Sequence, residues 1–166
     1  MSTYIQNILG QDNRSLIRGK KIVVVARDPG TPEVSSLIGS LEDADAKATV
    51  LMDMRGPRAD ADGHMLRRIL AEKPDMLIMY KCGTHLGGKN LDSCIELAQN
   101  MLRGKQSTPV LFVTAAEEGN HIDALKSTGA KTFGIGKSVP GIEDEMAGKI
   151  INQIAEIFVK APGHSA

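Results

Sequence analysis

Tryptophan is absent from the 166-residue chain, which contains only three phenylalanines and two tyrosines. Aromatic rings are the surfaces on which proteins stack single-stranded nucleic acid, so their scarcity argues against that function. A surplus of one charge is also missing, because 20 lysines and arginines balance 20 aspartates and glutamates. Dedicated nucleic-acid-binding proteins usually carry a basic surplus. We therefore expect no nucleic-acid partner.

Cysteine is scarce, and long apolar runs are missing. Cys82 and Cys94 do not form a CxxC motif, and two thiols make a poor disulfide framework. No apolar stretch approaches the roughly 18 to 20 residues that cross a bilayer. The first residues lack the basic start and apolar run of a signal peptide. We expect a protein of the reducing cytoplasm that does not enter a membrane.

What the sequence does contain is a regular alternation of strand and helix patterns. Five apolar runs predict strands at residues 21–26, 48–54, 75–80, 109–114 and 131–136. Apolar residues fill most of these runs without alternation, which is typical of strands buried on both faces of a parallel sheet. Amphipathic patterns between them predict helices. Together they predict one doubly wound, flavodoxin-like α/β domain with a five-stranded parallel sheet and helices on both faces.

The helical patterns also carry end signals and define the domain limits. Thr31 is a predicted N-cap with Pro32 at the first helical position, and a stripe from Ile142 to Ile157 predicts the last helix. Residues 1–19 are expected to form an N-terminal extension with a short helix through residues 4–9. Residues 20–160 form the domain and residues 161–166 a flexible tail. Chemistry in such a fold gathers at the carboxyl ends of the strands.

One segment resembles a known family. TPVLFVTAAEEGNHIDALKSTGAKTF, residues 108–133, resembles the fourth strand, fourth helix and fifth strand of response-regulator receiver domains without a gap. The match places Thr114 at the switch Ser/Thr of that family and Phe133 at its switch aromatic residue. KIVVVARDP and EKPDMLIMY resemble the strands that carry the receiver acids, so the likeness covers most of residues 20–159. It implies a receiver-like fold and a signalling function.

The matching positions of the receiver acids hold other residues. Ala26 and Arg27 stand where the family has two Mg²⁺-binding acids, and Tyr80 stands at the phosphorylated aspartate. Asp28 is the one acid nearby, and Lys137 falls one residue late for the family's lysine. Because Mg²⁺ requires oxygen ligands, we expect no aspartyl phosphorylation by the usual route. The predicted degenerate pocket comprises Ala26, Arg27, Asp28, Tyr80, Thr114 and Lys137. Tyr80 is interpreted both as a core aromatic residue and as a ring that fills the former acid pocket.

The resemblance favours a non-catalytic pseudo-receiver that binds another protein. Receivers usually present their output on the fourth helix, fifth strand and fifth helix, which implies residues 121–127, Phe133 and 142–149 here. The predicted switch and interface residues are His121, Lys126, Phe133 and Ile142. No cofactor is expected, and the four histidines have no metal-ligand spacing. A homo-oligomer is an alternative to a different partner protein.

A second resemblance gives a hypothesis of another class. FGIGKSVPGIEDEM, residues 133–146, resembles the end of the last strand and the start of the last helix of mutase-type cobalamin-binding domains. Their cobalt-ligating histidine loop has no counterpart in ARDPGTPEV. A degenerate cobalamin-type or other small-molecule-binding domain is therefore the alternative, with Thr84, His85 and Thr114 lining its pocket.

GTHLGGKN, residues 83–90, nearly matches a phosphate-binding P-loop. Backbone amides and Lys89 would bind an anion there, but Asn90 replaces the Mg²⁺-binding hydroxyl. The predicted anion or ligand loop comprises Cys82, Gly83, Thr84, His85, Gly87, Gly88 and Lys89. An enzyme acting on a phosphorylated metabolite is the third hypothesis, and a glycine-rich turn is the favoured structural one. Cys82, next to Lys81, is interpreted as a reactive thiol or as an inert residue, and His85 as a general base or as a solvated loop residue.

Overall fold

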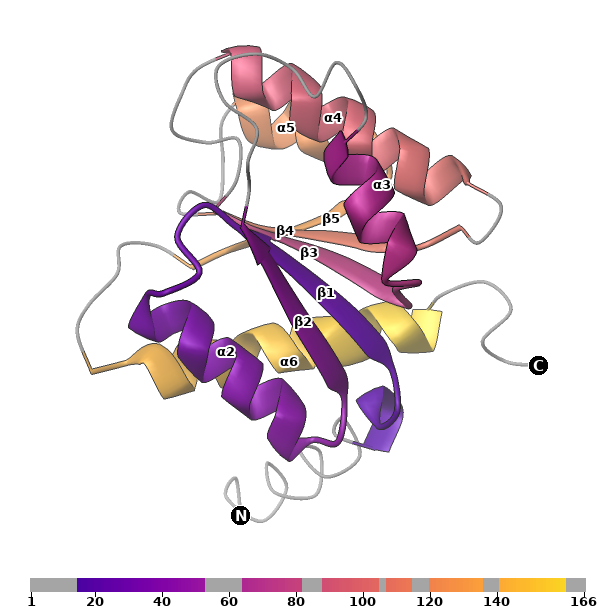
Figure 1. Ribbon diagram of the computed structural model, residues 1–166. Helices are drawn as coiled ribbons and strands as arrows, with labels where there is room; N and C mark the ends of the chain where they lie inside the picture. Colours follow the sequence, from indigo (N-terminus) through magenta and orange to yellow (C-terminus); the bar gives the residue numbers. More distant parts are fainter. Residues whose placement is uncertain are drawn as a thin grey trace.

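A computed structural model describes residues 15–52, 64–81, 88–104, 107–114, 120–135 and 141–160. Its strands and helices alternate along the chain (Figure 1). The strands are β1 (Lys21–Ala26), β2 (Lys47–Met52), β3 (Met76–Tyr80), β4 (Val110–Thr114) and β5 (Lys131–Gly134). The helices are α2 (Pro32–Asp43), α3 (His64–Ala71), α4 (Gly88–Arg103), α5 (Asn120–Lys126) and α6 (Glu143–Lys160).

All strand pairings are parallel, and the sheet has five strands in the order β2-β1-β3-β4-β5. This order is the flavodoxin-like version of the doubly wound fold. β3 and β4 are buried along their whole lengths, as expected for strands covered on both faces. The predicted fold is therefore confirmed, with strand ends that differ from the prediction by one or two residues where they can be compared.

Two helical layers cover the sheet (Figure 1). α2 and α6 cover one face, over a core that includes Ile22, Val24 and Ala26 of β1. α3, α4 and α5 cover the other face, where Val23 and Val25 of the same strand are buried. Successive strand residues point to opposite faces. This continuous apolar run is therefore shared between two separate cores.

The signal predicted for the start of α2 is present, and α6 begins one residue after the start of its predicted apolar stripe. Thr31 is the N-cap of α2, where its side chain accepts a hydrogen bond of 3.4 Å from the Val34 backbone amide, and Pro32 is the first helical residue. α6 begins with three acidic residues, which complement the positive end of the helix dipole. Ile142 precedes that helix, and its carbonyl accepts a bond from Met146.

A short helical turn at residues 15–17 precedes β1. Ile17 is fully buried in the core beneath α2 and α6, and the Gly19 amide donates to the Asp45 carbonyl at 2.8 Å. The end of the predicted extension therefore contacts the domain. The predicted helix at residues 4–9 and the tail at 161–166 lie outside the described residues. None of the helices in the described part of the chain has the length and apolarity to cross a membrane.

Candidate functional site

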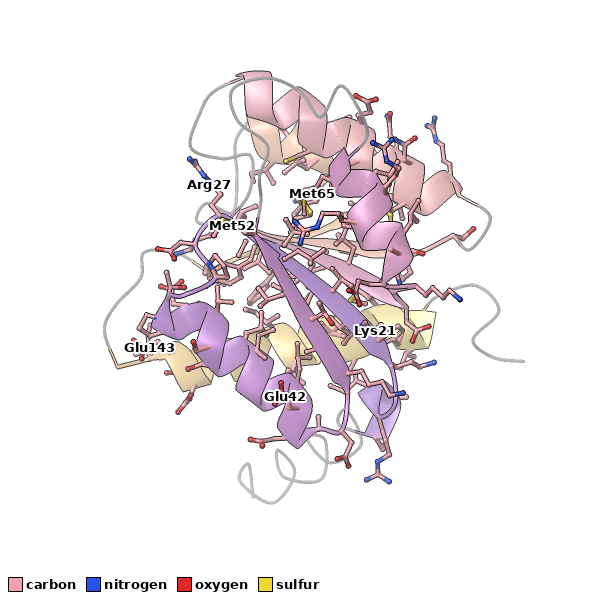
Figure 2. The ribbon with its side chains drawn as sticks, in the orientation of Figure 1. Lys21, Arg27, Glu42, Met52, Met65 and Glu143 are labelled. Carbon is pink, nitrogen blue, oxygen red and sulfur yellow. The ribbon has the colours of Figure 1, made fainter. Side chains whose placement is uncertain are left out.

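The carboxyl ends of β1 and β3 lie side by side, because Ala26 pairs with Tyr80. Ala26 is buried at this edge, whereas Arg27 and Asp28 directly after it are exposed. Lys21 and Arg27 mark the two ends of β1 in Figure 2. Asp28 Oδ1 accepts a hydrogen bond of 3.2 Å from the Gly30 amide. The remaining acid of this edge therefore supports the turn that leads into α2.

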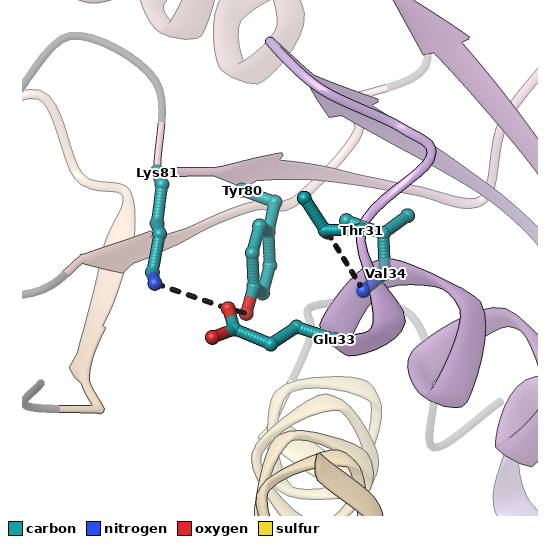
Figure 3. Close-up of polar contacts among 5 residues, drawn as sticks. All are labelled: Thr31, Glu33, Val34, Tyr80 and Lys81. Carbon is teal, nitrogen blue, oxygen red and sulfur yellow. Dashed lines mark hydrogen bonds and ion pairs between the residues drawn. The ribbon is translucent and has the colours of Figure 1, made fainter. Parts of the chain in front are cut away.

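Tyr80 directs its ring into the core beneath α2 and α6 and is only 4% exposed. Its hydroxyl donates to Glu33 Oε2 at 2.5 Å. Glu33 lies in the first turn of α2, and the Thr31 cap and Pro32 fix where that turn begins. Figure 3 shows the carboxylate reaching from this turn to the end of β3. This burial agrees with the interpretation of Tyr80 as a core aromatic residue, whereas the interpretation that its ring fills a former acid pocket stays a prediction.

Lys81 completes the cluster. Its Nζ lies 3.0 Å from the same Glu33 Oε2 and 5.8 Å from the centroid of the Tyr80 ring. The backbone at Lys81 has a positive φ of 52°, and its amide donates to the Val113 carbonyl at 2.7 Å. One carboxylate oxygen therefore joins a phenol and an ammonium group, as the dashed lines in Figure 3 mark.

Burial and the neighbouring Glu33 carboxylate hold Tyr80 in its neutral form. Burial raises the pKa of Tyr80 far above its ordinary value, and the hydrogen bond to Glu33 and the charge of that carboxylate raise it further. A tyrosinate would be desolvated and would face a carboxylate. The neutral phenol is therefore the donor in its hydrogen bond with Glu33.

Thr114 lies at the end of β4 and is buried, with 1% exposed. Its Oγ1 donates to the Phe133 carbonyl at 3.4 Å, and its own carbonyl accepts from the Ile135 amide at 2.9 Å. Phe133 is half-buried and packs against the core beneath α2 and α6. The predicted switch pair is thus adjacent at the β4–β5 edge, joined through a backbone carbonyl.

Of the other predicted site residues, the structure describes some and leaves others outside the described ranges. Lys126 is exposed at the end of α5, and Ile142 is half-buried before α6. His121 lies in α5, and Gly88 and Lys89 lie in the first turn of α4. The side chains of His121 and Lys89 lie outside the description. Cys82, Gly83, Thr84, His85, Gly87 and Lys137 lie outside the described residues altogether. The ligand loop and the cobalamin-type pocket thus stay predictions.

No cluster of three or more histidines, cysteines, aspartates or glutamates occurs among the residues with a described placement. Cys94 is a buried cysteine in the core beneath α3, α4 and α5.

Glu33 and Lys81 are the functional candidates that the sequence reasoning missed. An acid in the first turn of a helix is ordinary because it complements the helix dipole, so Glu33 carried no separate signal. Lys81 was considered only as a neighbour of Cys82. The one available hint was geometric: residues after β1 and β3 must meet at one edge of the sheet.

No family model matches the chain, and no curated protein matches its sequence. Solved structures do match. The phosphorylated cyanobacterial phytochrome response regulator RcpA is 14% identical, with a TM-score of 0.55 over 86% of this chain and 95% of that one. The receiver domain of a Francisella response regulator is 18% identical, with a TM-score of 0.51 over 82% of this chain and 98% of that one. An orphan response regulator of H. pylori is 14% identical, with a TM-score of 0.51 over 80% of this chain and 95% of that one.

These likenesses identify the fold. The chain has the flavodoxin-like fold of response-regulator receiver domains, with the same five-stranded parallel architecture.

Proposed function

We propose that this protein is a receiver-like regulatory module that is not phosphorylated on aspartate and acts by binding another protein. The observation that carries the proposal is Tyr80. A buried, neutral tyrosine hydrogen-bonded to Glu33 occupies the position that matches the receiver phosphoacceptor. A phenol in this state is not an aspartyl carboxylate and cannot form an acyl phosphate.

The end of β1 supports the same conclusion. Ala26 offers no side-chain oxygen, Arg27 brings a positive charge, and Asp28 already accepts the Gly30 amide. A Mg²⁺ ion takes near-octahedral oxygen coordination, and these three residues supply a single carboxylate. The protein therefore lacks the acid set at the matching positions that phosphoryl transfer in receivers requires.

The proposed partner surface is the face formed by α5, β5 and α6. Lys126 offers an exposed positive charge on it, while Phe133 is anchored in the core next to Thr114. This face therefore offers an apolar side chain and an exposed charge, and protein interfaces commonly combine apolar centres with polar surroundings.

Phosphorylation is tested by incubating the purified chain with acetyl phosphate and Mg²⁺ and measuring its intact mass. We expect an unchanged mass, with a phosphorylatable receiver as the positive control under the same conditions. Addition of one acid-labile phosphate group would overturn the proposal.

Partner binding is tested by native mass spectrometry of the protein captured from its own cells. We expect one defined protein to be captured with the parent chain. The control variant Lys73→Glu, which changes an exposed residue after α3, should still bind that protein, and Lys126→Glu should not. Equal retention by both variants would remove this face as the interface. A bound small molecule in place of a protein would favour the ligand-binding alternative.

A further inference from the structure

We propose that Glu33, Tyr80 and Lys81 form a polar latch that fastens the end of β3 to the first turn of α2. The latch fixes the carboxyl edge of the sheet in one conformation, and Glu33 is its positioning residue. The regulatory part of this inference rests on the proposed function. In a module without a phosphoryl group, the internal contact with Glu33 would hold the carboxyl edge of the sheet in one conformation.

The latch joins parts of the chain that no backbone hydrogen bond of the sheet connects. Glu33 belongs to α2, whereas Tyr80 and Lys81 end β3, separated from it by 47 and 48 positions. A single carboxylate oxygen accepts from the phenol at 2.5 Å and lies 3.0 Å from the ammonium group. Charge-assisted hydrogen bonds are the stronger kind, and two of them meet at one atom here.

Partial burial makes this contact effective. The side chains of Lys81 and Glu33 are 22% and 21% exposed, and Tyr80 is buried beside them. Water and salt screen such a pair less than a fully exposed one. The Tyr80 hydroxyl and the Lys81 ammonium group both give up a charge-assisted contact with Glu33 when the latch opens. These two contacts therefore favour the closed state.

The backbone at Lys81 supports the same reading. A φ of 52° lies in the left-handed region, which residues with a side chain disfavour. The Lys81 amide donates to the Val113 carbonyl at 2.7 Å, so the backbone is held at this residue. The ion pair with Glu33 offsets the cost of the left-handed conformation, and that conformation orients the Lys81 side chain toward α2.

Glu33→Gln is the central test, and Glu42→Gln is its matched control. Both substitutions remove one negative charge from α2, but Glu42 is exposed on the last turn of the helix. Hydrogen exchange is measured at the first turn of α2 and at the end of β3. We expect exchange there to become about fivefold faster in Glu33→Gln, corresponding to about 1 kcal/mol of local opening. Glu42→Gln should exchange like the parent protein.

Tyrosine absorbance gives a second, independent readout. The chain has two tyrosines and no tryptophan, so Tyr4→Phe leaves Tyr80 as the one tyrosine reporter. In that background Glu33→Gln should shift the near-ultraviolet absorbance of Tyr80, because the substitution removes the carboxylate that accepts the hydrogen bond of the phenol. Identical exchange and identical tyrosine absorbance in Glu33→Gln and Glu42→Gln would overturn the latch.

The contribution of Lys81 to the latch can be tested with a substitution at Lys81 and a control substitution at Lys73. Lys73 also has a left-handed backbone, with φ of 51° against 52° at Lys81, but it lies two residues after α3 and its side chain is exposed. Lys81→Met should accelerate exchange at the first turn of α2, and Lys73→Met should not. Equal exchange in both variants would show that Lys81 takes no part in the latch.

The two proposals fail separately. Phosphate incorporation from acetyl phosphate, together with faster exchange in Glu33→Gln, would overturn the proposed function and leave the latch intact. An unphosphorylated chain with unchanged exchange in Glu33→Gln would overturn the latch and leave the proposed function intact.

Discussion

At the amino edge of the sheet, Lys21 Nζ lies 3.0 Å from Glu72 Oε2, and at the carboxyl edge Lys81 Nζ lies 3.0 Å from Glu33 Oε2. A hydroxyl group accompanies each ion pair. At the amino edge Lys21 Nζ donates to Thr49 Oγ1 at 2.7 Å, so the hydroxyl is an acceptor for the positively charged group. At the carboxyl edge the Tyr80 hydroxyl donates to the Glu33 carboxylate, so the hydroxyl is a donor to the negatively charged group.

The two clusters differ in how deeply their members are buried. The amino-edge cluster ties β1 to β2 and to the end of α3, with side chains of Lys21 and Glu72 that are 25% and 36% exposed. The carboxyl-edge latch rests on a tyrosine ring buried in the core. When an amino-edge contact breaks, its groups turn toward water. When the latch breaks, a buried phenol loses its acceptor. Burial, and not ion-pair length, should therefore decide which cluster matters more.

The largest difference is expected on removal of the two hydroxyl-bearing side chains. Tyr80→Ala deletes a buried aromatic ring and should lower the free energy of unfolding by about 3 to 5 kcal/mol. Thr49→Ala, on a half-buried residue of the edge strand β2, should cost less than about 1 kcal/mol. Urea unfolding of both variants measures the difference.

Tyr80→Phe separates the ring from its hydroxyl. We expect it to cost about 1 to 2 kcal/mol, because the ring still fills the core while Glu33 loses a donor. A cost as large as that of Tyr80→Ala would mean that the hydroxyl, and not the ring, carries the stability. A Tyr80→Ala variant as stable as Thr49→Ala would contradict the burial argument itself.

The next largest effect should appear in double-mutant cycles across the two ion pairs. We expect a coupling free energy of about 1 to 1.5 kcal/mol between Glu33 and Lys81, reduced from that of a fully buried charged bond by partial exposure. The coupling between Lys21 and Glu72 should stay below about 0.5 kcal/mol. Both cycles are measured by urea unfolding at low and high salt. Equal couplings, or equal loss of both in salt, would show that the two edges are energetically alike.

The sequence was sufficient to predict the fold because the fold depends on patterns that are local. Apolar runs without alternation identified strands buried on both faces, and the Thr31–Pro32 start of α2 followed from cap chemistry. Strand ends were less well predicted. Asp75 and Pro109 were included in strands but precede them. The Asp75 carboxylate instead accepts from the Lys21 amide at 2.7 Å, and proline has no N–H to donate to a ladder.

The sequence predicted where the candidate site lies on the sheet, but not the side-chain contacts within it. The end of β3 was a predicted functional edge because carboxyl ends of parallel strands meet there, and the resemblance to receiver domains singled out Tyr80 at that end. The contact of Tyr80 and Lys81 with Glu33 was not, since it depends on side-chain reach across 47 and 48 positions of sequence. An acid in a first helical turn looks the same whether it caps a dipole or binds a buried phenol.

A smaller effect should distinguish the two left-handed lysines. Replacing Lys73 with glycine removes the strain of a positive φ and should raise the free energy of unfolding by about 0.5 to 1 kcal/mol. Lys81→Gly relieves the same strain but also removes the ion pair with Glu33. We therefore expect no gain, or a small loss, at Lys81. Equal stabilisation by both substitutions in urea unfolding would mean that the Lys81 side chain contributes nothing to stability.

The smallest effect is expected at Arg18 and Asp45, the most exposed of the ion pairs described. Arg18 Nε lies 3.6 Å from Asp45 Oδ2, and the two side chains are 71% and 68% exposed. Arg18→Ala should change the free energy of unfolding by less than about 0.3 kcal/mol, because solvent screens the pair and holding two long side chains costs entropy. The side chains become less exposed from Arg18–Asp45 to Lys21–Glu72 and then to Lys81–Glu33. Arg18→Ala therefore gives the smallest stability change against which the other two ion pairs are compared. Should Arg18→Ala cost as much as Lys81→Met, exposure would not order the three ion pairs, and the contrast between the two edges of the sheet would need another cause.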